Sequence, residues 1–176
     1  MPAGAQDLED AIFVDAWTPD MDADPTDNSF GQVLHVSQLG SVDQYLGGSE
    51  TSDALIGDGG NDTLIGGSGD DILIPGSGTD TVEGGDGISD LMGVDYTAGQ
   101  RPDQELVVDL EVGTSTNDGY GNTDTLVSVE DILGTRFGDT ILGDDMPNLL
   151  IGAEGNDLID GRAGNDLVWG GAGNDT

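Results

Sequence analysis

The sequence predicts an all-β solenoid in which short parallel strands stack as a β-roll. Three observations favour this fold class. A nine-residue period runs through two parts of the chain, an acidic residue recurs at the sixth position with an aliphatic one at the eighth, and 31 of the 176 residues are glycine whereas only 5% are aromatic. A regular period of this kind indicates stacked structural units and not one thick core.

Each repeat divides into a turn and a strand. The first six residues are rich in glycine, which adopts backbone angles that other residues avoid. The last three, such as "TLI" or "ILI", are β-branched or aliphatic and predict a minimal strand whose middle residue points to the face opposite its neighbours. Two repeats then close one coil, and the core is one aliphatic side chain thick on each side, too thin to supply much stability.

The first frame begins at Gly48 and the second at Gly134. The sixth position, at the end of each turn, holds Asp53, Asp62, Asp71 and Asp80 before the pattern decays at Ser89, and then Asp139, Asn148, Asp157, Asp166 and Asp175, with Glu130 one step upstream. The eighth position, expected to point into the core, holds Leu55, Leu64, Leu73, Val82, Leu91, Ile132, Ile141, Leu150, Ile159 and Val168.

Residues at the sixth position recur above one another every 18 residues if two repeats form a coil. Stacked carboxylates repel one another and would unravel a thin roll unless a cation lies between them. Calcium fits best because it takes about six to eight oxygen ligands, whereas magnesium demands stricter geometry and zinc prefers His or Cys. The stacked pairs are Asp53 with Asp71, Asp62 with Asp80, Asp139 with Asp157, Asn148 with Asp166, and Asp157 with Asp175.

Glycine-rich turns can also aim several backbone carbonyls at one point, so the turn glycines are candidate ligands beside the sixth-position side chains. The predicted metal-site residues are Asp53, Gly57, Gly59, Gly60, Asp62, Gly66, Gly69, Asp71, Gly76, Gly78, Asp80, Asp139, Asn148, Gly152, Gly155, Asp157, Gly161, Gly164, Asp166, Gly170, Gly173 and Asp175.

Acidic residues number 36 against three arginines and no lysine, and the formal net charge is −33. This composition is also typical of a disordered acidic chain, but a disordered chain has no reason to keep one aliphatic residue per repeat. The chain has no basic patch for nucleic acid, no apolar run long enough to span a bilayer, and no secretory signal at its amino terminus. Cysteine is absent, so any stapling must come from oxygen ligands.

The repeats resemble the nonapeptide Gly-Gly-x-Gly-x-Asp-x-aliphatic-x of RTX (repeats-in-toxin) proteins. The resemblance is strong at residues 57–83 and 152–176 and weaker where Thr51, Phe137 and Met146 replace the fourth glycine and Asn148 replaces the aspartate. It implies a right-handed parallel β-roll, calcium-dependent folding after export, type I secretion from a Gram-negative bacterium, and a secreted or cell-surface location.

Four segments are expected: an acidic lead-in (1–46), a first repeat block (47–92), a β-rich insertion (93–129) and a second block (130–176), which ends within a repeat and predicts a fragment. In the insertion, residues 106–112 alternate as a half-buried strand and residues 115–122 form a turn. Because Asp53 and Asp139 are not separated by a multiple of nine residues, the insertion forms longer coils or a hairpin. Residues 20–28 are similar to a calcium loop but lack its glycine and its bidentate glutamate.

The function predicted from the residues is binding of about five calcium ions that drives folding. No catalytic residues are predicted, since His35 stands alone in a strand-like segment and no nucleophile motif is present. Two alternatives remain open: a surface recognition or adhesion module, and the non-catalytic C-terminal part of a secreted hydrolase or toxin. The outward-facing Ile56, Ile65 and Ile74 indicate a face covered by the amino-terminal segment or by a partner.

Overall fold

The computed structural model describes residues 33–35, 41–93 and 101–176. Every regular element in this part of the chain is a strand, and no described segment forms a helix that could span a membrane. The strands are β1 (Val33–His35), β2 (Tyr45–Gly47), β3 (Ala54–Ile56), β4 (Thr63–Gly67), β5 (Ile72–Ile74), β6 (Thr81–Gly85), β7 (Leu91–Gly93), β8 (Leu106–Asp109), β9 (Thr114–Asp118), β10 (Asp124–Val127), β11 (Asp131–Leu133), β12 (Thr140–Leu142), β13 (Leu149–Ile151), β14 (Leu158–Asp160) and β15 (Leu167–Trp169).

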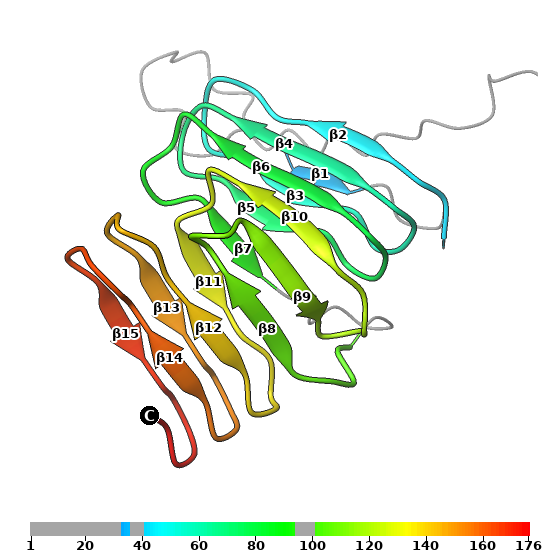
Figure 1. Ribbon diagram of the computed structural model, residues 1–176. Helices are drawn as coiled ribbons and strands as arrows, with labels where there is room; N and C mark the ends of the chain where they lie inside the picture. Colours follow the sequence, from blue (N-terminus) through cyan, green and yellow to red (C-terminus); the bar gives the residue numbers. More distant parts are fainter. Residues whose placement is uncertain (1–32, 36–40, 94–100) are drawn as a thin grey trace, which may run out of the picture.

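The strands form two sheets that face each other (Figure 1). One sheet has the order β1-β3-β5-β7-β11-β13-β15 and the other β14-β12-β8-β9-β10-β6-β4-β2. Consecutive repeats alternate between the sheets, so that Leu55 pairs with Leu73 in one sheet and Leu64 with Val82 in the other. Within each repeat block the neighbour of a strand in its sheet is therefore two repeats away, and the predicted all-β parallel roll is confirmed.

The core is a single row of side chains on each sheet. Eighth-position residues are fully buried in the middle of the roll, including Leu64, Leu73 and Ile141 at 0% exposure. Burial weakens at the carboxyl end, where Ile159 is partly buried and Val168 is 47% exposed. The fifth repeat departs from the prediction: Met92 is the buried residue and pairs with Leu73, while Leu91 is only half-buried.

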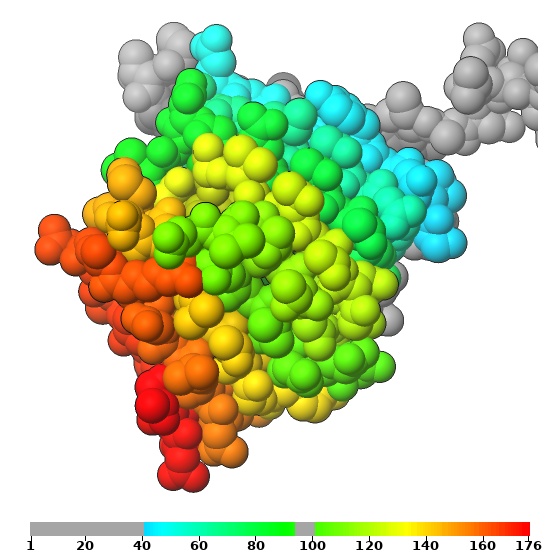
Figure 2. Space-filling model, in the orientation of Figure 1, coloured from blue at the N-terminus to red at the C-terminus, as the bar shows by residue number. Residues whose placement is uncertain are grey.

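The insertion contains an antiparallel hairpin. Strand β9 pairs antiparallel with both β8 and β10, whereas β10 is parallel to β6 and β8 is parallel to β12. The space-filling view shows this segment, in green to yellow, between the amino-terminal repeats and the orange-to-red end of the roll (Figure 2).

Two details of the prediction for the insertion were wrong. Strand β8 ends at Asp109, so Val112 lies in the turn and is 67% exposed. Residues 115–118 belong to β9 and not to a turn, because their backbone pairs with β8. The side chains of β9 are mostly polar, so hydrophobic alternation along the sequence did not predict this strand.

The lead-in is described only in part. His35 lies in β1, which pairs with β3, and β2 continues the second sheet, as expected for a strand and a lead-in coil. The acidic loop expected at residues 20–28 lies outside the described residues. The outward-facing Ile56, Ile65 and Ile74 are half-buried.

Candidate metal centre

The turns depend on left-handed backbone conformations at the second and fourth positions of the repeat. Gly60 and Gly78 occupy the fourth position in repeats two apart and have φ angles of 123° and 149°. A side chain at Gly78 would also collide with the carbonyl oxygen of Gly60, because the two turns stack directly. Glycine is therefore required here both by its conformational freedom and by the close approach of the backbones.

The sixth-position side chain joins each coil to its neighbour. The backbone amide of Asp53 donates to Oδ1 of Asp71 at 2.7 Å, and the amide of Asp62 donates to Oδ1 of Asp80 at the same distance. All five stacked pairs predicted from the sequence lie next to each other in this way. The other three bonds run from Asp139 to Asp157 (2.8 Å), Asn148 to Asp166 (3.1 Å) and Asp157 to Asp175 (3.2 Å).

Six aspartates, four of them from these pairs, have a second carboxylate oxygen that is buried and has no hydrogen-bond partner in the described part of the chain. The atoms concerned are Oδ2 of Asp62, Asp71, Asp80, Asp90, Asp124 and Asp157. Buried polar atoms are normally satisfied, because an unpaired one carries its full desolvation penalty. These six oxygens are therefore available to bind a cation.

Four of these oxygens, Oδ2 of Asp62, Asp71, Asp90 and Asp157, lie between the first glycine of their own turn and a carbonyl of the next coil. A carbon atom added to Gly57 would lie 2.5 Å from Asp62 Oδ2 and would also meet the Pro75 carbonyl oxygen. The same arrangement recurs at Gly152, between Asp157 Oδ2 and the Gly170 carbonyl oxygen, which would lie 2.6 Å from the added carbon. Carboxylate and carbonyl oxygens converging on a small space are the ligands that calcium prefers.

The described residues hold no group of three or more His, Cys, Asp or Glu side chains that could bind a metal by themselves. A calcium ion would therefore take one or two carboxylates from neighbouring coils and complete its shell with backbone carbonyls. The residues present fit calcium and do not fit zinc, which binds through nitrogen and sulfur.

Burial raises the pKa of these carboxyl groups. It brings the pKa of Asp62, Asp71 and Asp80 to about 6 and that of Asp124 to about 8, opposed in part by the hydrogen bond from the neighbouring coil and reinforced by nearby carboxylates. Burial also raises the pKa of Asp90, Glu130, Asp139 and Asp157. The charged carboxylates are thus destabilised in these positions unless a cation compensates them.

The structure adds residues that the sequence analysis left out of the site. Asp90 accepts a hydrogen bond from the amide of Asp71 at 2.8 Å. Asp90 lies one residue after the sixth position of the nine-residue frame, because the turn before it contains an extra residue. Asp124 accepts the amide of Asp80 across 44 residues of sequence, at 3.0 Å. Glu130 accepts the amide of Asp90 through Oε2 at 3.1 Å. The motif "GGDGISD" carried a signal for Asp90, whereas nothing near Asp124 resembles a repeat.

The remaining predicted residues divide by their surroundings. Asp53, Asp139 and Asn148 have partners within the chain for their second side-chain atom. Asp166 is half-buried and Asp175 is exposed, since they lie in the last coils. Among the predicted glycines, Gly59 pairs with Ser77 in a parallel bridge, Gly66, Gly161 and Gly170 face a carboxylate, and the others adopt positive φ: Gly69, Gly76, Gly155, Gly164 and Gly173.

Comparison with known proteins agrees with this geometry. The family model described as "RTX calcium-binding nonapeptide repeat (4 copies)" matches residues 47–82 and 142–176. A search of curated proteins finds no match. The resemblance predicted from the sequence is confirmed over the matched residues, which bind calcium in this family, and no catalytic family is found.

Proposed function

We propose that the RTX repeats of this chain bind about five calcium ions and that this binding drives the folding of a secreted or cell-surface module. The observation that carries the proposal is the set of buried carboxylate oxygens without a hydrogen-bond partner among the described residues, four of which lie beside a carbonyl of the next coil. A bound calcium ion would compensate the negative charge of these buried oxygens.

The charge balance supports coupling between binding and folding. The chain carries a net charge of −33 and a core one side chain thick, so self-repulsion opposes compaction in the absence of metal. About five divalent ions would bring the net charge to roughly −23 and link neighbouring coils. Because each site contains atoms from two coils, it exists only after those coils have stacked.

This coupling also suits export. Extracellular calcium modules bind with dissociation constants of about 10⁻⁴ to 10⁻³ M, far above cytosolic calcium. The chain would stay expanded in the cytosol, in a form that a type I channel can transport, and would fold outside the cell. The export route rests on the RTX resemblance.

Far-UV circular dichroism tests the proposal on the full chain. The spectrum is recorded after removal of metal, in millimolar calcium, and in an equal concentration of magnesium as the matched control. We expect a disordered spectrum without metal, a strand spectrum in calcium, and little change in magnesium. Equal strand content in the metal-free and calcium samples would refute calcium-driven folding.

A further inference from the structure

The turns of the roll fall into two classes that differ in the second residue of the repeat. In three repeats the amide of this residue donates to the sixth-position side chain of the same repeat. Ser49 donates to Asp53 Oδ2 at 2.5 Å, Thr135 to Asp139 Oδ2 at 2.5 Å, and Asp144 to Asn148 Oδ1 at 3.0 Å. We name these the closed turns.

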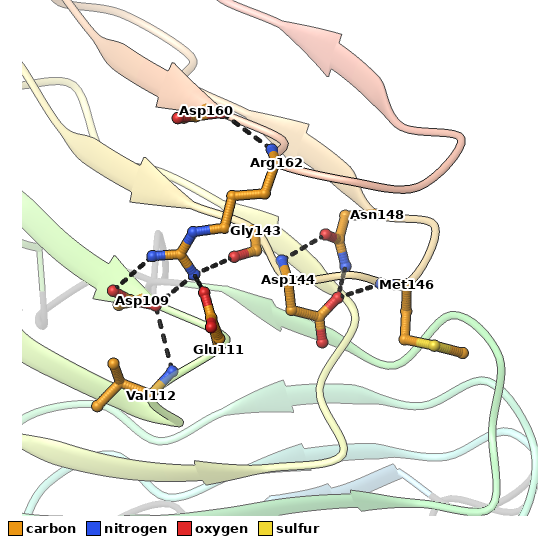
Figure 3. A network of polar contacts seen from close by, with 9 residues as sticks. All are labelled: Asp109, Glu111, Val112, Gly143, Asp144, Met146, Asn148, Asp160 and Arg162. Carbon is orange, nitrogen blue, oxygen red and sulfur yellow. Dashed lines mark hydrogen bonds and ion pairs between the residues drawn. The ribbon is translucent and has the colours of Figure 1, made fainter.

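Side chains strengthen the closed turns. The Ser49 hydroxyl donates to Asp53 Oδ2 at 2.9 Å, and the Thr135 hydroxyl donates to Asp139 Oδ1 at 2.7 Å. In the third closed turn Asp144 Oδ1 accepts the amide of Met146 and the side-chain amide of Asn148 (Figure 3). Each closed turn therefore satisfies its sixth-position side chain with groups of the protein.

In the other repeats the second residue is left-handed, which turns its amide away from the carboxylate. We name these the open turns. The left-handed conformation is a requirement of the open turn and not only a consequence of glycine at this position. It also occurs at Asp58 (φ 67°), Ala153 (φ 77°) and Arg162 (φ 61°), where the side chain makes it unfavourable. The buried oxygens without a partner in the nonapeptide repeats belong to open turns: Asp62, Asp71, Asp80 and Asp157.

Asp90 belongs to the open class although it lies outside the residues matched by the RTX repeat. Gly85 before it has φ 120°, Asp90 is 0% exposed, and its Oδ2 has no hydrogen-bond partner of good geometry among the described residues. The Gly87 amide nevertheless lies near this carboxylate and lowers its pKa, against the larger effect of burial. A carbon atom added to Gly84 would lie 2.6 Å from this oxygen and would also meet the carbonyl oxygen of Ser128. The carboxylate, the carbonyl and the glycine are arranged as in the repeats.

We propose that the calcium sites are the open turns whose sixth-position carboxylate oxygen is buried without a partner, and that the three closed turns hold their coils together without calcium. These sites lie at Asp62, Asp71, Asp80, Asp90 and Asp157. The proposal rests on the function proposed above and assigns it to individual turns. In a closed turn an N–H occupies the carboxylate oxygen, so a calcium ion would have to displace a donor whose positive end repels it. Asn148, which carries no charge, is the one sixth-position amide in the nonapeptide repeats, and it lies in a closed turn.

The proposal is tested by counting calcium ions per chain, by equilibrium dialysis and atomic emission, in the wild type and in two matched variants. Asp90→Asn keeps an oxygen to accept the Asp71 amide but removes the charge, and it should bind one ion fewer than the wild type. Asp53→Asn makes the same change in a closed turn, where Asn148 shows that an amide is accommodated, and it should bind the wild-type number.

Opening a closed turn gives an independent measurement. The double variant Ser49→Gly, Thr51→Gly restores the glycines of an open repeat around Asp53, and it should bind one ion more than the wild type. Equal losses from Asp90→Asn and Asp53→Asn, or an unchanged count in the double variant, would overturn the division into two classes. A wild-type chain that binds no calcium would instead overturn the proposed function itself.

Discussion

Replacing one core leucine should raise the calcium concentration needed for folding by a predictable factor. Leu73 is 0% exposed and packs in the row of eighth-position side chains. A fully buried Leu→Ala change costs about 2–5 kcal/mol, and the thin roll has no second layer that could collapse into the cavity. We take about 3 kcal/mol as the loss of folding free energy in Leu73→Ala.

Because binding and folding are linked, the loss of folding free energy corresponds to an increase in the calcium concentration at the folding midpoint. If about five ions bind only to the folded chain, the folding free energy changes by about five times RT ln of the calcium concentration. A loss of about 3 kcal/mol is then offset by an increase of about threefold in calcium. Titration of the full chain with calcium, followed by far-UV circular dichroism, measures this midpoint directly.

The matched control is Val168→Ala, which shortens an aliphatic side chain at the same repeat position where the residue is 47% exposed. Surface substitutions usually change stability by less than about 0.5 kcal/mol, so its midpoint should rise by less than about 1.5-fold. Equal shifts for the two variants, or no shift for Leu73→Ala, would refute the claim that this row of side chains supports the roll.

Three further outcomes are expected. Burial raises the pKa of Asp62, Asp71 and Asp80 from 3.8 to about 6, so the metal-free fold binds protons more tightly than the unfolded chain and its stability should rise as pH falls from 8 towards 5. The metal-free chain should therefore gain strand signal in circular dichroism on acidification, and a spectrum without this gain would contradict the prediction. Gly78→Ala should raise the calcium midpoint of folding several-fold, because Gly78 has φ 149° and its added carbon would collide with a carbonyl oxygen of the neighbouring coil. The control Gly47→Ala, whose added carbon has open space around it, should leave the midpoint unchanged. Equal midpoints for the two variants would contradict this prediction. Arg162→Met should lower the urea midpoint of unfolding at fixed calcium, since Arg162 binds both oxygens of Asp109 at 2.6 and 2.8 Å (Figure 3). Arg136→Met should lower the midpoint less, and the reverse order would count against this ion pair.

The ion pair of Arg162 shows how the insertion is held to the second block. Its guanidinium donates to Asp109 at the end of β8 and to the carbonyl of Gly143, and it lies 3.2 Å from Glu111 (Figure 3). The hydrogen bond from Arg162 lowers the pKa of the Asp109 carboxyl, so this pair persists where other carboxyls of the chain would protonate. Sequence patterns could not predict the contact, since the partners are 53 residues apart.

The fold was predictable from the sequence because its period is local. A turn of six residues and a strand of three place Leu55, Leu64 and Leu73 inward whatever the distant residues are, and the pairing of residues 18 apart follows from two repeats per coil. The prediction was wrong in the fifth repeat, where the nine-residue period is interrupted. One extra residue before Asp90 moves the carboxylate and Met92 into the places expected for Ser89 and Leu91, because a loop absorbs an insertion while the sheet keeps its register.

The roll, the row of inward aliphatic residues and the stacking of the sixth-position side chains can all be predicted from the sequence, since each depends only on spacing along the chain. Which carboxylate oxygens lack a partner becomes clear only from the three-dimensional structure. That depends on the direction of one amide in each turn, and Ser49 and Thr135 direct theirs at the carboxylate whereas Asp58 and Ala153 adopt the left-handed conformation and do not. The carbonyls that complete a site come from another coil, so their positions exist only once the coils have stacked.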